Sequence, residues 1–245
     1  MTAPPVAPPP RTPGAAAPVV PDALTGPEAS TLAWVGPFAV FMLLLAVTGE
    51  LPLPVLQREL LRMAILVAAI VGFSRHVLPH RAPHWLASTA LGVGVFAMWV
   101  APDVLIAGWR DHWLFQNGVT GRIRTSIAPD ELTPPVLALR FLRAALVVPI
   151  VEELFWRGWL PRWLQDTRFA RVPLGTYTSF AFWSTAALFA AEHGPFWEVG
   201  LLCGVVYNWW MRRTRSLGDL ILAHAVTNAC LSAYVIASER WGFWM

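Results

Sequence analysis

Long apolar runs separated by short charged breaks define the pattern of this chain. From residue 31 onward the runs lie at 32–48, 60–78, 85–106, 136–163, 176–193, 197–211 and 217–238. A mostly apolar run of about 17–25 residues is long enough to cross a bilayer as a helix. A lone strand would leave its backbone groups unpaired in lipid, so each run is predicted to be helical. The run at 197–211 is short for a crossing and is expected to be tilted or embedded among its neighbours.

The stretch 109–134 does not follow this pattern. It mixes Trp109, Trp113 and Phe115 with several charged residues. We expect an interfacial loop that contains a short amphipathic helix. If the stretch instead contains part of a further transmembrane helix, the number of such helices rises from seven to eight. The predicted fold is therefore all-α, a polytopic integral membrane helix bundle of seven to eight transmembrane helices around an intramembrane polar cavity.

Residues 1–30 form a separate zone ahead of a domain at 31–245. Nine of the 22 prolines lie between Pro4 and Pro27. Proline at this density removes the hydrogen bonds of helices and strands. The composition predicts a disordered, Pro-rich N-terminal tail.

Composition supports the membrane interpretation. Apolar residues make up 56% of the chain and charged residues 13%, whereas soluble domains contain about 25% charged residues. A single soluble core of this size cannot hide so much apolar surface. All 18 basic residues are arginines. Most of them lie between apolar runs, where they anchor helix ends, and they form no patch that fits a groove, so no nucleic-acid partner is expected.

Glu152, Glu153 and Arg157 interrupt the fourth apolar run. Ionisable side chains at membrane depth are costly and usually face a protein interior or a cavity. Glu153 and Arg157, four residues apart, share a helix face and can pair. Glu152 then points about 100° away and is free for chemistry. Taken alone, the motif also fits a helix end with snorkelling side chains.

Two further motifs each place a histidine on the same helix face as a residue four positions away. Phe189 and His193 are four residues apart, as are His224 and Asn228. Taken alone, each has a structural explanation, namely a hydrogen-bonded histidine at a helix end and a polar contact between helices. However, Glu152 and Asn228 each lie ~18 Å along their helices from one side of the bundle, and His193 lies ~25 Å along its helix. These depths favour one polar site between the helices.

In this order the motifs resemble the CAAX-prenyl-protease and bacteriocin-processing family of intramembrane glutamic endopeptidases, over roughly residues 135–240. Three motifs match the family. They are a Glu-Glu pair with an Arg four residues after the second Glu, a Phe with a His four residues later, and a His with an Asn four residues later. The stretch Val35-Gly36-Pro37-Phe38 also resembles a subgroup found beside bacterial exosortase systems. The resemblance implies eight helices and hydrolysis of a peptide bond in a membrane-associated substrate.

The resemblance also implies roles for the motif residues. Glu152 would be the general base that activates water, His193 would hold that water, and His224 and Asn228 would stabilise the oxyanion. Supporting roles would fall to Glu153, Arg157 and Phe189. Amide hydrolysis requires an activated water and donors for the oxyanion, so the chemistry agrees. No metal or other cofactor is expected under this hypothesis. The expected partners are the lipid bilayer and a membrane-associated peptide, and the expected location is the bacterial inner membrane.

Two alternatives compete with this hypothesis. Glu152, His193 and His224 could together bind zinc with an open fourth position, although the chain has no HExxH motif. A non-catalytic scaffold or a transporter could use Glu and His as a proton relay. A transporter would favour paired interrupted helices in two similar halves, which the sequence does not show. Activity that survives a chelator but is lost in Glu152→Ala would favour the glutamic protease.

Overall fold

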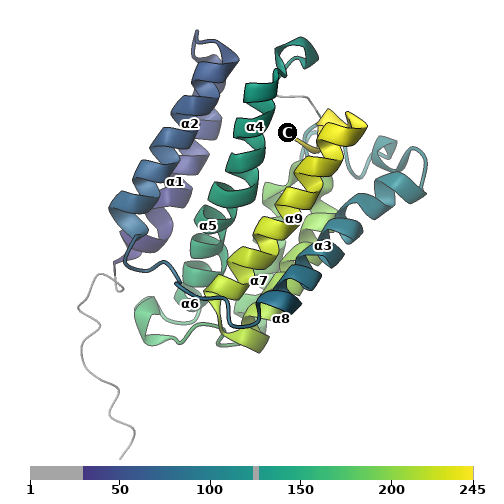
Figure 1. The fold of residues 1–245 in the computed structure, drawn as a ribbon. Coiled ribbons are helices and arrows are strands. Elements are labelled where there is room, and N and C mark those ends of the chain that lie inside the picture. The colour runs from purple at the N-terminus through teal and green to yellow at the C-terminus, as the bar shows by residue number, and fades with distance from the viewer. Residues whose placement is uncertain (1–29, 124–126, 245) are drawn as a thin grey trace, which may run out of the picture.

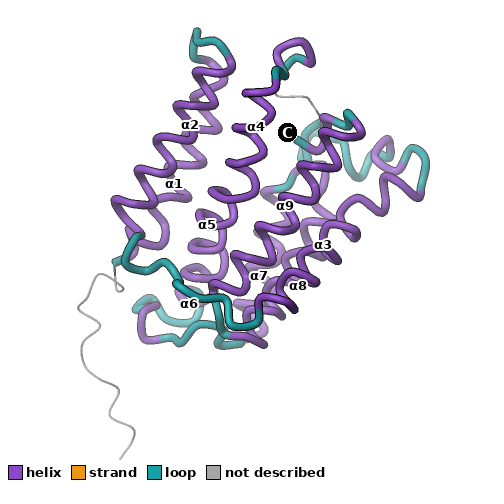
Figure 2. Tube along the Cα trace, in the orientation of Figure 1, coloured by secondary structure: helices purple, strands orange, loops and turns teal. Residues whose placement is uncertain are grey.

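The computed structural model describes residues 30–123 and 127–244, and these residues form a bundle of helices (Figure 1). Figure 2 shows helices joined by loops, with no strand in the part of the chain described. The predicted all-α fold is therefore confirmed. The predicted Pro-rich tail falls almost entirely on residues 1–29, which lie outside the described residues.

In the described part of the chain, seven long helical stretches match the seven predicted runs. Six of them are α1 (Thr31–Val47), α2 (Val55–Ala69), α3 (Trp85–Leu105), α7 (Ser179–Glu192), α8 (Trp197–Thr214) and α9 (Leu217–Ser238). The seventh is a continuous helix of 30 residues, Pro134–Trp163. It consists of α4 (Pro134–Leu142), α5 (Val148–Glu153) and α6 (Leu160–Trp163), joined by π-helical segments at Arg143–Val147 and Leu154–Trp159.

Among the described residues, length and apolar composition qualify four stretches as candidate membrane spans: Thr31–Glu50, Trp85–Leu105, Pro134–Trp163 and Leu217–Ser238. Large apolar side chains such as Leu43, Leu86 and Phe180 lie exposed on the outside of the bundle, as expected where helices face lipid. The chain is an integral membrane protein. The count of seven to eight crossing helices stays a prediction, because the other helices are shorter or more polar.

One predicted boundary and one predicted element were wrong. The helix expected at 60–78 begins at Val55 and continues through a π-helical segment at Ile70–Ser74. Its first turns contain charged residues, which is why hydropathy placed the start too late. The short amphipathic helix expected within 109–134 is also absent from the described residues of that stretch. Only single 3-10 turns occur there, at Trp109–Asp111 and Pro129–Glu131.

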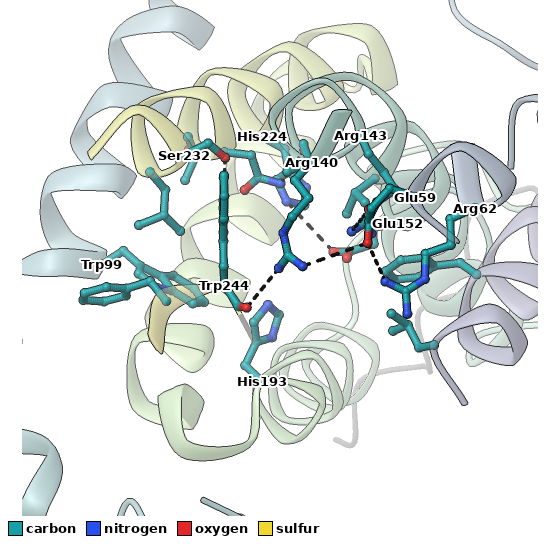
Figure 3. A pocket seen from close by; sticks show the side chains of 18 of the residues that line it. Glu59, Arg62, Trp99, Arg140, Arg143, Glu152, His193, His224, Ser232 and Trp244 are labelled. Carbon is teal, nitrogen blue, oxygen red and sulfur yellow. Dashed lines mark hydrogen bonds and ion pairs between the residues drawn. The ribbon is translucent and has the colours of Figure 1, made fainter. Parts of the chain in front are cut away.

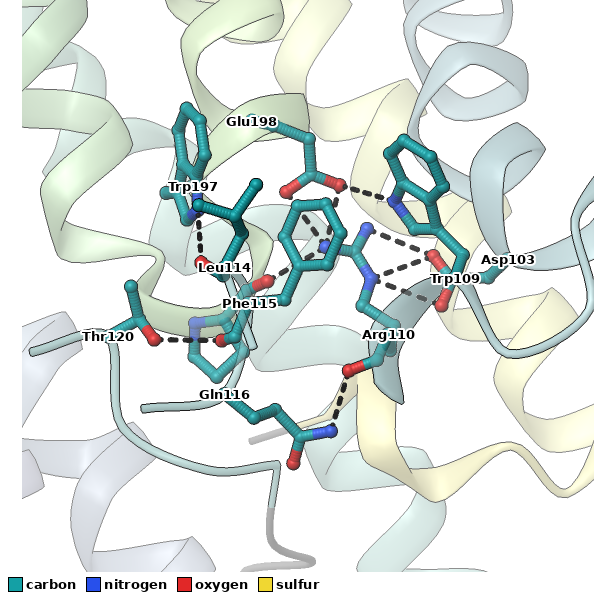
Figure 4. Close-up of polar contacts among 10 residues, drawn as sticks. Asp103, Trp109, Arg110, Leu114, Phe115, Gln116, Thr120, Trp197 and Glu198 are labelled. Atoms are coloured by element: carbon teal, nitrogen blue, oxygen red, sulfur yellow. Dashed lines mark hydrogen bonds and ion pairs between the residues drawn. The ribbon is translucent and has the colours of Figure 1, made fainter. Parts of the chain in front are cut away.

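Arg110 explains why this stretch folds as a loop (Figure 4). Its Nε donates to the two carboxylate oxygens of Asp103 at 3.1 and 2.9 Å, and its Nη1 donates to Glu198 at 2.8 Å. The same Nη1 donates to the carbonyl of Pro195 at 2.7 Å. Charge-assisted hydrogen bonds of this kind are about twice as strong as neutral ones. Arg110 thus fixes the loop to the ends of α3 and α8.

The helices α3 and α9 approach closely at Gly92. A Cβ atom added to Gly92 would clash with the carbonyl oxygen of Ala223. The hydroxyl of Thr227 lies at the same contact, 2.9 Å from the Gly92 carbonyl and 3.1 Å from that of Ala223. Small residues at membrane helix interfaces permit such close approach of two backbones. The contact matters for function because α9 carries His224 and Asn228.

Gly92→Ala should therefore destabilise the bundle. The added methyl group must displace the α9 backbone, and overpacking of this kind costs about 1–3 kcal/mol. Gly94→Ala is the matched control on the same helix, because a Cβ atom at Gly94 meets nothing within 4 Å. Thermal unfolding in detergent, followed by Trp fluorescence, should show a lower Tm for Gly92→Ala only. Equal Tm values for the two variants would contradict the close-contact explanation.

Candidate active site

The helix Pro134–Trp163 runs through the middle of the bundle, between the α1–α2 pair and α9 (Figure 1). Its two π-helical segments flank Glu152 and Glu153. Each segment is followed closely by a proline, Pro149 or Pro161. Proline has no N–H to donate, so the regular i to i−4 pattern of helical hydrogen bonds is interrupted there. Interruptions of the π-bulge type are frequent at functional sites.

Glu153 forms the predicted ion pair with Arg157. Its Oε1 accepts a hydrogen bond from Arg157 Nη1 at 2.9 Å, and both side chains are almost fully buried. The same oxygen lies 2.8 Å from His224 Nδ1, a contact that the sequence did not predict. One buried carboxylate therefore joins the central helix to α9.

Arg157 also contacts α7 and α8. Its Nε donates to Asn208 Oδ1 at 3.1 Å. Its guanidinium carbon lies 4.3 Å from the ring centre of Phe189 and 5.4 Å from that of Tyr207. Cations over aromatic faces are attracted by the ring quadrupole. Phe189, in the second motif, therefore stabilises the buried charge of Arg157. Sequence reasoning missed Asn208 and Tyr207, whose only signal is their polarity within an apolar run.

The contact with Glu153 fixes the orientation of His224. An ionised carboxylate only accepts hydrogen bonds, so the Nδ1 atom of His224 carries the proton. The other ring nitrogen, Nε2, lies 3.9 Å from Glu152 Oε2. Within the described residues this is the only polar contact of Glu152. Glu152 and Glu153 therefore lie in different surroundings, as their divergence on the helix predicts.

His193 lies at the C-terminal end of α7. Its Nδ1 is 2.7 Å from the carbonyl oxygen of Phe189. A carbonyl only accepts, so Nδ1 donates this bond and Nε2 is left for other partners. The rings of Phe189 and Trp99 pack against the imidazole, with centroids at 4.5 and 5.1 Å. His193 is thus held at a defined place on the cavity wall.

Asn228 binds the backbone of the central helix. In the π register Val148 donates to Arg143, five residues back. The next carbonyl in this register, that of Ala144, would face Pro149, which has no N–H. Asn228 Nδ2 donates to Ala144 at 2.9 Å instead. The side chain satisfies this carbonyl and is thereby fixed beside the central helix.

All four predicted catalytic residues line one cavity of about 580 Å³, namely Glu152, His193, His224 and Asn228. Figure 3 shows Glu152, His193 and His224 around it. The cavity also has a second polar group that sequence reasoning missed, consisting of Glu59, Arg62, Arg140 and Arg143. The structure thus brings the three motifs together, whereas their catalytic roles stay predictions.

Within the described residues, no group of three or more His, Cys, Asp or Glu side chains is placed to hold a metal ion. The zinc alternative requires Glu152, His193 and His224 as ligands. The Nδ1 atoms of the two histidines already contact Phe189 and Glu153, so only their Nε2 atoms could bind a metal. Metal analysis of the purified protein addresses this alternative directly.

Comparison with known proteins agrees with the motif analysis. Residues 134–230 match the family model of Rce1-like type II CAAX prenyl endopeptidases. This range contains all three motifs, from Glu152 to Asn228. No curated protein and no solved structure matches the chain significantly.

Arg157→Ala should strongly destabilise the protein. Removing one partner of a buried pair leaves Glu153 uncompensated, at a cost of about 3–5 kcal/mol. Arg168→Ala is the control, because the Arg168 side chain is 67% exposed. Thermal unfolding should show a large loss of Tm for Arg157→Ala and almost none for Arg168→Ala. A stable but inactive Arg157→Ala protein would instead assign Arg157 a direct part in the chemistry.

Proposed function

We propose that this membrane protein, in which residues 134–230 match the family model of Rce1-like type II CAAX prenyl endopeptidases, is a glutamic intramembrane endopeptidase. It hydrolyses a peptide bond with a water molecule activated by Glu152. The observation that carries the proposal is the convergence of Glu152, His193, His224 and Asn228 on one cavity. A protease that works at membrane depth needs such a polar space, because water must reach the scissile bond.

Glu152 is the group suited to activate water. Its neighbour Glu153 is engaged with Arg157 and His224, whereas Glu152 keeps both carboxylate oxygens available to the cavity. In the first step the water oxygen attacks the carbonyl carbon and its proton passes to Glu152. In the second step the C–N bond breaks, and Glu152 returns the proton to the leaving nitrogen. We assign His193 Nε2 to accept a hydrogen bond from the same water, because Nδ1 already donates to Phe189.

Asn228 and His224 are suited to stabilise the oxyanion. The Asn228 amide has two N–H groups, and the contact with Ala144 uses one of them. The second can donate to the oxyanion. His224 can donate through Nε2 when its ring carries both protons, and the resulting imidazolium lies between Glu152 and Glu153. Donors fixed before the reaction are effective because they need no reorganisation.

The proposed substrate is a membrane-associated peptide or protein, in keeping with the family. The proposed location is the bacterial inner membrane, since frequent Ala, Arg and Pro are typical of a GC-rich bacterial genome. The exosortase-associated subgroup is the narrower proposal for its place in the family.

Glu152→Gln should abolish cleavage and leave the fold intact, because an amide keeps the shape but cannot accept the proton. Purified protein is incubated with a panel of peptides, some carrying a prenylated cysteine and some unmodified, and products are identified by mass spectrometry. Glu131→Gln, at an exposed glutamate, is the control and should retain the wild-type rate.

The same assay separates the alternatives. Wild-type activity that resists a chelator, in protein free of bound metal, supports the glutamic mechanism. Loss of activity on chelation, with recovery on addition of zinc, would support the zinc protease. Substantial cleavage by a monodisperse Glu152→Gln protein would remove Glu152 as the general base.

Asn228→Ala should lower kcat by about 10²–10³ with little change in KM, as expected for one oxyanion donor. Ser232→Ala is the matched control, because Ser232 lies one turn further along α9 and lines the same cavity. Kinetics and Tm are measured for both variants. A change confined to KM, or a lower Tm with an unchanged rate per folded molecule, would leave Asn228 with a packing role only.

A further inference from the structure

A group of arginines lines the cavity on the side of α2 and α4 (Figure 3). Within the described residues, the cavity wall here includes four guanidinium groups and the carboxylate of Glu59; the arginines are Arg58, Arg62, Arg140 and Arg143. Glu59 is only 1% exposed. This basic wall belongs to the same cavity as Glu152, and the proposed hydrolysis does not use it.

The carboxylate of Glu59 is shared among several arginines. Its Oε1 accepts from Arg62 Nη1 at 2.7 Å. Its Oε2 accepts from Arg143 Nε at 3.2 Å and lies 3.1 Å from Arg143 Nη2. Arg140 Nη1 lies 4.0 Å from Oε1. Within the described residues, Arg62 and Arg143 therefore share one carboxylate.

Arg62 and Arg143 retain unused donors. A guanidinium has five N–H groups. Within the described residues, Arg62 Nη2 and Arg143 Nη1 make no hydrogen bond. The two side chains are only 14% and 12% exposed. Buried charge is costly unless it is paired, so an anion that enters the cavity would be bound favourably here.

The protein's own backbone at Trp244 lies beside these arginines. Trp244 lies in the cavity wall, and its backbone carbonyl accepts a hydrogen bond from Arg140 Nη2 at 3.0 Å. The guanidinium of Arg140 also lies 5.1 Å from the centre of the Trp244 ring. An arginine of the basic wall thus binds peptide backbone within the cavity.

We propose that Arg62 and Arg143 form a subsite for a carboxylate of the peptide substrate. This inference rests on the proposed endopeptidase function. Residues 143 and 152 are nine positions apart on one helix, or ~13 Å at 1.5 Å per residue. An extended peptide spans ~3.3–3.6 Å per residue. The carboxylate therefore lies about four residues from the scissile bond, as a terminal carboxylate or as an acidic side chain.

Binding to the Glu152→Gln protein tests the subsite without a need for cleavage. The probes are three dansyl-labelled peptides of Ala and Leu that differ only at the C-terminal end: a free carboxylate, an amide, and an amide that follows a terminal Asp. The acid should bind at least about tenfold more tightly than the plain amide, which corresponds to ~1.4 kcal/mol. The Asp peptide shows whether a side-chain carboxylate serves equally well.

Arg62→Gln and Arg143→Gln should reduce the acid-to-amide ratio towards one, and Arg143→Lys should restore part of it. Arg168→Gln, at an exposed arginine, should leave the ratio unchanged. If an arginine variant fails to fold, the acid-to-amide affinity ratio of the Glu152→Gln protein, which keeps all its arginines, still tests the proposal. Equal affinity for both carboxylate probes and the plain amide, or binding that depends on phosphatidylglycerol in the micelles instead, would overturn the proposal.

The two proposals can fail separately. Acid-selective binding together with active Glu152→Gln protein would keep the subsite and remove the glutamic mechanism. Cleavage that requires Glu152, by a protein whose binding shows no preference for a carboxylate, would keep the glutamic mechanism and remove the subsite.

Discussion

The buried carboxylate of Glu153 is the constraint on which the site depends. It accepts a hydrogen bond from Arg157 on the same helix and one from His224 on α9. Arg157 extends the connection to Asn208 on α8 and to the ring of Phe189 on α7. An uncompensated charge at this depth would be strongly destabilising. The four helices are therefore held in one arrangement, which leaves the adjacent Glu152 on the cavity wall.

Local spacing accounts for what the sequence could predict. Glu153 and Arg157 are one helical turn apart, so their pairing follows from the helical period alone. The runs at 85–106 and 217–238 matched α3 and α9 almost to the residue because both are mostly apolar and have polar or charged residues close to each end. Counting residues along the helices also correctly indicated that the three motifs meet.

Contacts between distant segments account for what the sequence could not predict. Glu59 and Arg143 are 84 positions apart, and no periodic pattern connects them. The bond from Asn228 to Ala144 depends on a π-helical segment ahead of Pro149, whose register cannot be derived from composition. Arg110 likewise converts an amphipathic stretch into a loop through partners on α3 and α8. In each case a charged or polar group finds a partner that only the folded chain supplies.

The central claim is that two adjacent carboxylates have separate tasks, Glu152 in chemistry and Glu153 in holding the site together. The most direct measurement compares Tm and the single-turnover rate per folded molecule for Glu153→Gln and Glu152→Gln. The account predicts a large loss of Tm for Glu153→Gln with measurable residual cleavage, and a normal Tm with no cleavage for Glu152→Gln. A Glu153→Gln protein of wild-type Tm that is as inactive as Glu152→Gln would contradict it.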